Sequence, residues 1–100
     1  MVEVKAIQKL TGFNFYHAIG SPTYVCAPMV DQSELPFRML VRNHGTQLCY
    51  TPMLHSRLFV EQKGYKEMMF STCIKDRPLV VQFCGNDPDT LVRAAKLVED

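Results

Sequence analysis

Gln82 is the one amide side chain inside an otherwise apolar run, Leu79-Val80-Val81-Gln82-Phe83. A buried primary amide needs partners for two N–H donors and one carbonyl acceptor, and leaving them unpaired costs about 1–3 kcal/mol. Neighbouring backbone or an ordered water could satisfy these groups. Alternatively, the amide points into the mouth of a site and bonds the polar edge of a heteroaromatic ring, for which a flavin would be suitable. The residue types leave both interpretations open.

A second candidate is the pair Pro28-Met29, which follows the apolar run Tyr24–Ala27. Proline has no N–H, so a central strand cannot continue through it, and the backbone groups on either side become available to a ligand. A short turn then leads into Ser33-Glu34-Leu35-Pro36, which predicts a helix start with Ser33 as its cap. In α/β proteins, ligands bind where a strand end, a loop and a helix N-terminus follow one another. The structural alternative is an ordinary strand stop, with Met29 filling the core.

The thiols and imidazoles give weaker signals. The four cysteines are Cys26, Cys49, Cys73 and Cys84. They form no Cys-x-x-Cys pair and no zinc-ligand spacing with histidine, so we expect no metal site. Cys26 and Cys49 fall in predicted strands and Cys84 directly follows a third; in such positions a free thiol behaves as a small buried hydrophobe. His44 and His55 lack a carboxylate at an informative spacing and are expected in loops.

Three predicted strands position these candidates, over residues 24–27, 47–51 and 79–83. The first two end in proline followed by methionine. The third is nearly continuous in its apolar residues, as expected for a parallel strand that is covered on both faces. The length from Cys26 to Cys49 fits one right-handed βαβ unit, whereas residues 54–77 are longer than a plain connection needs. The sequence thus predicts an α/β fold with a parallel sheet.

The first predicted helix covers residues 33–43. Its apolar positions at helical spacing are Phe37, Leu40 and Val41. Arg38 and Arg42 lie together on the opposite side, which predicts a solvated face rather than a contact with RNA.

The last predicted helix starts at Asp87 and Pro88, as cap and first helical residue, and runs to Asp100. Its predicted buried stripe consists of Leu91, Val92, Ala94, Ala95 and Val98. A weaker helical pattern covers residues 61–70, and the loose alternation over 9–16 predicts a short hairpin or an irregular lid.

Composition indicates one small globular domain or part of a larger one, since the chain has 100 residues, 47% hydrophobic and 21% charged. A formal net charge of +1 gives no indication of an anionic partner. No apolar run approaches the roughly 20 residues that span a bilayer, and the first residues lack a signal-peptide core. These features predict a cytoplasmic or nuclear protein that does not bind membranes.

Three blocks of the chain resemble the tRNA-dihydrouridine synthases, most closely the eukaryotic branch that acts on neighbouring uridines of the tRNA D-loop. The blocks are Val25–Leu35, Gln47–His55 and Asp76–Pro88, and they occur in the order found in the family. The resemblance extends over about Lys9 to Asp100.

The resemblance implies a TIM-type (β/α)8 barrel, of which this chain would hold the first three βα units. Residues 1–20 would form an N-terminal extension and lead-in, and residues 21–100 the N-terminal part of an FMN-binding barrel. Of the family's FMN contacts, the chain would carry those made by Pro28, Met29, Val30 and Gln82. In the family NADPH reduces the flavin, which passes hydride to a uracil ring of the tRNA substrate.

In the family, a cysteine in an Asn-x-Gly-Cys-Pro turn after the fourth strand donates the proton. No cysteine of this chain stands at that position, which would lie beyond Asp100, so no catalytic residue is assigned. The chain alone is expected to be inactive and to have open sheet edges, which invite aggregation. Two other functions stay open: a non-catalytic fragment that binds a partner through its sheet edge, and a flavin barrel that acts on a free pyrimidine.

Overall fold

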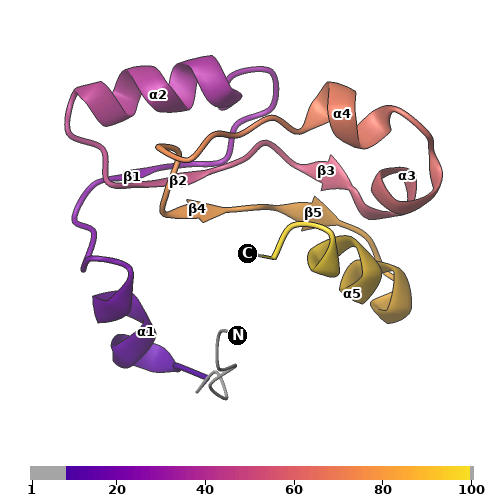
Figure 1. Cartoon of the computed structure of the whole chain (residues 1–100), viewed down its shortest axis with the longest axis horizontal. Helices are drawn as coiled ribbons and strands as arrows, with labels where there is room; N and C mark the ends of the chain where they lie inside the picture. Colours follow the sequence, from indigo (N-terminus) through magenta and orange to yellow (C-terminus); the bar gives the residue numbers. More distant parts are fainter. Residues whose placement is uncertain (1–8, 100) are drawn as a thin grey trace, which may run out of the picture.

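The computed structural model describes residues 9–99 of the chain. Residues 1–8 of the expected N-terminal extension therefore lie outside the described residues. The elements in chain order are α1 (Gly12–Ala18), β1 (Val25–Cys26), α2 (Leu35–Asn43), β2 (Leu48–Tyr50), β3 (Leu54–His55), α3 (Ser56–Glu61), α4 (Tyr65–Met69), β4 (Leu79–Val80), β5 (Phe83–Cys84) and α5 (Pro88–Lys96) (Figure 1).

The strands form a parallel sheet in the order β1-β2-β4, and a second parallel pair joins β3 to β5. Cys26 pairs with Cys49, which in turn pairs with Leu79, so the three strands share one register. In Figure 1, α2 lies above the three-stranded sheet and α5 lies below β5. The predicted α/β fold with parallel strands is confirmed.

A β-bulge interrupts the strand that the sequence predicted as continuous over residues 79–83. Tyr50 pairs with Val80 and Leu54 pairs with Phe83, so residues 51–53 lie opposite residues 81–82. One strand thus has an extra residue at this point, and such a bulge bends the strand and redirects its side chains. The single strand predicted over 79–83 is therefore seen as β4 and β5, and β3 was not predicted.

The helix starts differ from the predictions in their capping. Helix α2 begins at Leu35, and the Ser33 side chain does not cap it but bonds Met29. At α5, Asp87 stands in the N-cap position, but its carboxylate accepts from Thr90 Oγ1 rather than from a backbone N–H. Both helices have proline in the first turn, as predicted.

Two predicted segments near the ends of the sheet were wrong in detail. Residues 61–70 do not form one helix, because Gly64 takes φ +86° between α3 and α4. Residues 9–16 form neither a hairpin nor an irregular lid, because residues 12–16 belong to α1. In this helix the rings of Phe13, Tyr16 and His17 contact one another at helical spacing.

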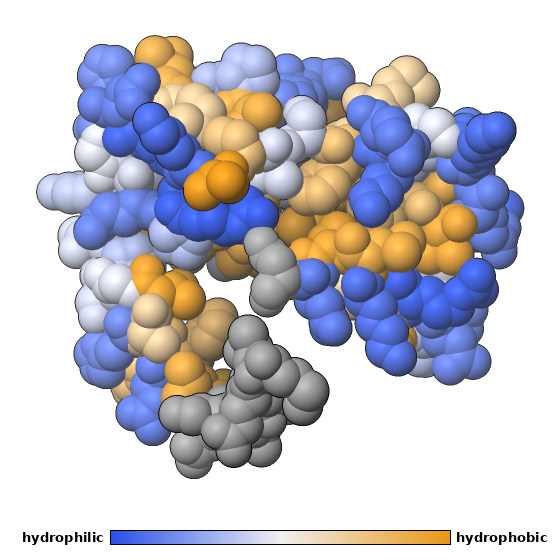
Figure 2. All heavy atoms as spheres, in the orientation of Figure 1, coloured by the Kyte–Doolittle hydropathy of each residue, from blue (hydrophilic) through white to orange (hydrophobic). Residues whose placement is uncertain are grey.

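The apolar core is small and is formed where α3 and α5 pack against β3 and β5. Leu54, Phe59 and Ala94 form its buried centre. The partly buried side chains packed against it are Val60, Tyr65, Phe70, Val81, Phe83 and Val98. Figure 2 shows the apolar band of this region across the right half of the molecule.

The predicted buried stripe of α5 is only partly correct. Ala94 is fully buried and Leu91 and Val98 are half-buried, but Val92 and Ala95 are exposed. Among the described residues the most extensive contact of α5 is with α3, and the part of the stripe outside the core faces outward. Leu40 of α2, also predicted to be buried, is exposed as well.

The prediction of a solvated arginine face on α2 was wrong. Arg38 is 2% exposed, and its guanidinium contacts the carboxylate of Asp76, which is fully buried, at 2.8 Å. Arg42 contacts the other carboxylate oxygen of Asp76 at 2.9 Å. The sequence spacing of α2 could not show this, because the acidic partner comes from the loop before β4.

Candidate functional site

The Pro28–Val30 turn follows β1 at the carboxyl edge of the parallel sheet. Pro28 is exposed, Met29 is half-buried and Val30 is 69% exposed. Because Pro28 cannot donate to a neighbouring strand, the ladder stops at this point and the chain turns toward α2.

Ser33 closes this turn. The Met29 N–H donates to Ser33 Oγ at 2.8 Å, and the same hydroxyl donates to the Met29 carbonyl at 3.1 Å. That carbonyl also accepts from the N–H groups of Gln32 and Ser33, at 3.3 and 3.0 Å. Both backbone groups of Met29 are thus directed inward. The N–H of Val30 has no protein acceptor within the described residues.

Gln82 lies in the bulge between β4 and β5. Its N–H donates to Thr51 Oγ1 at 3.0 Å, and its carbonyl accepts from the N–H of Leu54 at 2.9 Å. Within residues 9–99 its side-chain amide makes no hydrogen bond, and the residue is half-buried. The structure therefore holds the backbone on both sides and leaves the amide free for a ligand.

The shared register places the turn and Gln82 at the same edge of the sheet. Pro28 follows two positions after Cys26, and Gln82 follows three positions after Leu79, in strands that run in parallel. The carboxyl ends of such strands are the usual ligand-binding edge. An unpaired side-chain amide and an unpaired backbone N–H at the same edge of the sheet suit the donors and acceptors of a flavin ring. These residues therefore fit FMN, and their contact with it stays a prediction.

Thr51 is a site residue that the sequence reasoning missed. It is 1% exposed, and its hydroxyl accepts from the Gln82 N–H while donating to the carbonyl of Pro52 at 2.9 Å. In this way a side chain replaces the ladder bond that the bulge removes. The signal in the sequence was a hydroxyl residue directly before a strand-ending proline.

The cysteines are free thiols: Cys26 and Cys49 lie in β1 and β2 as expected, and Cys84, predicted directly after a strand, lies in β5. Cys26 and Cys49 are both buried neighbours in the sheet. Burial raises the pKa of Cys49 to about 11, against the opposing charge of Arg42. At neutral pH this thiol is protonated and is a poor nucleophile.

The two candidate histidines, His44 and His55, both have structural roles. His44 follows α2, as expected of a loop residue, and its Nδ1 lies 2.9 Å from the carbonyl of Leu40. His55 does not lie in a loop: it belongs to β3 and caps α3, accepting from the N–H of Leu58 at 3.3 Å. The sequence spacing gave no sign of this cap, since β3 itself was not predicted.

A cavity of about 430 Å³ opens beyond the carboxyl ends of β3 and β5. Its lining residues are His55, Ser56, Arg57, Glu61, Gly85, Asn86, Asp87 and Thr90. None of the residues predicted to hold the flavin belongs to this lining, although Gly85 is only three positions after Gln82.

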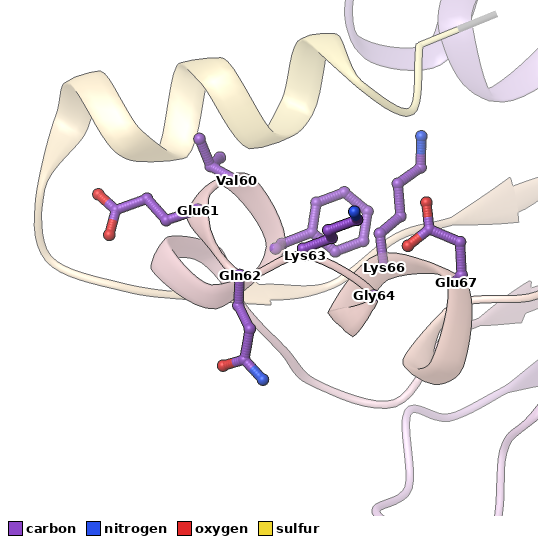
Figure 3. A pocket seen from close by; sticks show the side chains of 8 residues that line it. Val60, Glu61, Gln62, Lys63, Gly64, Lys66 and Glu67 are labelled. Atoms are coloured by element: carbon purple, nitrogen blue, oxygen red, sulfur yellow. The ribbon is translucent and has the colours of Figure 1, made fainter.

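A second cavity of about 420 Å³ lies at the turn between α3 and α4 (Figure 3). The Lys66 side chain points toward the end of α5, where its Nζ lies 3.5 Å from the Leu97 carbonyl, and Gln62 points the opposite way. This cavity is lined by residues 59–64, 66 and 67 and lies away from the strand ends, so it is not the candidate site.

Over residues 9–99, no group of three or more His, Cys, Asp or Glu residues is arranged to hold a metal ion. The same residues include no helix with the length and apolarity needed to cross a bilayer.

Comparisons with known proteins match residues 25–100 to the family described as Dihydrouridine synthase (Dus). The chain is 54% identical over 94 residues to a tRNA-dihydrouridine(16/17) synthase of Schizosaccharomyces pombe, which covers 92% of this chain and 24% of that protein. It is 57% identical over 97 residues to the Saccharomyces cerevisiae protein of the same name, covering 94% and 23%. Both names include NAD(P)(+).

A human protein named tRNA-dihydrouridine(20a/20b) synthase-like is 42% identical over 91 residues, which are 91% of this chain and 28% of that protein. The chain therefore spans about a quarter of the length of the curated relatives it matches.

Proposed function

Because this chain belongs to the dihydrouridine synthase family, we propose that it forms the first three βα units of an FMN-dependent tRNA-dihydrouridine synthase. The proposal is supported by the three-stranded parallel sheet and by α2 and α5, which follow β1 and β5, because a (β/α)8 barrel is built from such parallel strands and helices. The observation that carries the proposal is the 54–57% identity to tRNA-dihydrouridine(16/17) synthases over more than nine tenths of the chain.

In the complete protein, Pro28, Met29, Val30 and Gln82 hold the flavin ring. The Val30 N–H would be the backbone donor that this turn offers the ring, because the Met29 N–H is already bonded to Ser33. The Gln82 amide would offer the ring a donor and an acceptor, while Thr51 and Leu54 keep its backbone in place. When bound and reduced by NADPH, FMN would supply the hydride that, together with a proton, reduces the uracil ring of a D-loop uridine.

This chain alone supplies part of that site. It covers about a quarter of its relatives, and its buried Cys49 has a pKa too high for an acid–base role near neutral pH. The proton donor and most of the tRNA-binding surface belong to the remainder of the enzyme. We therefore expect the isolated 100 residues to have no activity.

Purified complete protein, incubated with NADPH and unmodified tRNA, tests the proposal. We expect bound FMN to be released on denaturation, and we expect mass spectrometry of the digested tRNA to show uridine gaining two hydrogens in the D-loop. Free uracil serves as the competing substrate.

Reduction of free uracil without reduction of tRNA would favour a barrel that acts on free pyrimidines. A complete protein that purifies without flavin, binds none and modifies no tRNA would favour the non-catalytic, partner-binding alternative.

A further inference from the structure

Asp31 adopts φ +58° in the turn between Pro28 and Ser33, a conformation that residues with a Cβ rarely take. Such a backbone persists only where surrounding contacts hold it. In this turn the contacts are hydrogen bonds to Met29. Ser33 Oγ accepts from the Met29 N–H and donates to the Met29 carbonyl. The N–H groups of Gln32 and Ser33 also donate to that carbonyl.

Ser33 is itself held from behind by Arg38. Arg38 Nη1 donates to the Ser33 carbonyl at 2.8 Å, and its Nε and Nη2 donate to Asp76 Oδ2 at 3.0 and 2.8 Å. Nη2 also donates to the Ser71 carbonyl at 2.7 Å. Ser33 and Asp76 are fully buried and Arg38 is 2% exposed, so solvent does not compete for these bonds.

From this continuous chain of hydrogen bonds we propose that Ser33, fixed by the buried Arg38–Asp76 pair, is a positioning residue that pre-shapes the Pro28–Val30 turn for the flavin ring. The inference rests on the proposed function. Ser33 does not touch the ring. It holds the Met29 backbone inward, so that the next N–H, that of Val30, faces the ligand. A turn that must be ordered on binding loses affinity relative to one already in the bound shape.

Arg42 provides a matched control. Like Arg38, it contacts Asp76, through Nε at 3.0 Å. Its other bonds, to the carbonyls of Gln47, Arg77 and Pro78, lie at the amino ends of β2 and β4, away from the turn. Arg42→Lys therefore weakens the same ion-pair cluster but removes no hydrogen bond of Ser33.

The experiment compares Ser33→Ala, Ser33→Cys and Arg42→Lys in the complete protein, with each apoprotein first tested by thermal melting. The FMN dissociation constant is then measured by quenching of flavin fluorescence. We expect Ser33→Ala to raise this constant roughly tenfold, because it removes both side-chain bonds to Met29. The visible absorption band of the bound flavin should shift as well. Ser33→Cys, nearly isosteric and a weaker hydrogen-bonding group, should give an intermediate value. Arg42→Lys should lower the melting temperature and leave the constant within about twofold of wild type.

Arg42→Lys could raise the FMN dissociation constant as much as Ser33→Ala does, with an equal loss of melting temperature. That result would show that the effect of Ser33→Ala is general destabilisation, and it would overturn the inference. Wild-type affinity in both Ser33 variants would overturn it too, while leaving the proposed function intact. A wild-type protein that binds no FMN would overturn both.

Discussion

The backbone of Gln82 is fixed by two hydrogen bonds that do not involve its side chain. This separation makes the residue a sharp test of the candidate site. Removing the amide leaves the bonds to Thr51 and Leu54 unchanged, so an effect on cofactor binding would not come from unfolding of the bulge.

Gln82→Ala in the complete protein should weaken FMN binding roughly tenfold or more, since it removes up to two hydrogen bonds worth about 1 kcal/mol each. The thermal melt of the apoprotein should stay close to that of wild type. Gln62→Ala, at an exposed glutamine in the turn between α3 and α4, is the control and should change neither quantity. A Gln82→Ala protein that remains as yellow as wild type after purification would exclude a cofactor role for this amide.

At the scale of elements, the buried ion pair joins α2 to the loop that precedes β4. Asp76 accepts from Arg38, Arg42 and Thr72 and has no exposed surface. Burial by itself raises the pKa of this carboxyl, but the hydrogen bonds and charges of the two arginines and Thr72 outweigh it. They hold the pKa below the ordinary value of 3.8.

A carboxyl whose pKa is lowered by folding stabilises the folded state fully above the unfolded-state pKa, and that stabilisation is lost as the pH falls through the folded-state value. We therefore expect the stability supplied by Asp76 to be complete above about pH 4 and to decline in more acidic solution. Asp76→Asn should lower the free energy of unfolding by about 3–5 kcal/mol at pH 7, because it leaves the Arg38 guanidinium buried without its counter-charge.

Chemical denaturation of the complete protein between pH 3 and 7 measures this effect. The control is Glu99→Gln, which neutralises an exposed carboxylate and should change stability by less than about 0.5 kcal/mol. An Asp76→Asn protein as stable as wild type, with the same acid dependence, would show that the ion pair does not hold α2 in place.

Gly85, which directly follows β5, lies close to α3 and α5 because it has no side chain. A Cβ added at Gly85 would overlap Ser56 Oγ and would come within 3.3 Å of Leu91 Cδ2. Gly85→Ala should therefore destabilise the protein by about 1–3 kcal/mol. Adding Ser56→Ala removes the overlapping oxygen, so the double variant should recover part of that loss. Denaturation of the two single variants and the double variant gives the coupling energy, and simple additivity would contradict the steric explanation.

At the scale of the whole molecule, the described chain is more open than a typical domain of its size. Its radius of gyration is 14.8 Å, against about 13 Å expected for 100 residues. Helix α1 has no buried residue. Figure 2 shows apolar side chains gathered at this helix as well as over the core. The exposed large hydrophobic residues include Phe13, Phe15, Val30, Met68, Ile74 and Val92.

The isolated chain should accordingly bind the dye ANS, melt over a broad temperature range and associate as its concentration rises, because apolar surface and sheet edges stay uncovered. Circular dichroism melting and light scattering measure this, with the complete protein as the comparison. A sharp, concentration-independent melt of a monomer would show that these residues fold on their own.

The sequence by itself determined where the strands stop and which residues stand at their ends. Pro28 and Pro52 lack the N–H that a ladder needs, and that local property identified the Pro28–Val30 turn. The apolar run around Gln82 likewise singled out its amide.

Only the tertiary structure decided the bulge opposite Thr51, the cap made by His55 and the burial of Arg38. Each of these depends on a partner brought near by strand pairing or loop closure, and Asp76 lies 38 positions after Arg38. Helical periodicity describes the two sides of one helix, and it carries no information about which distant charge will cover either side.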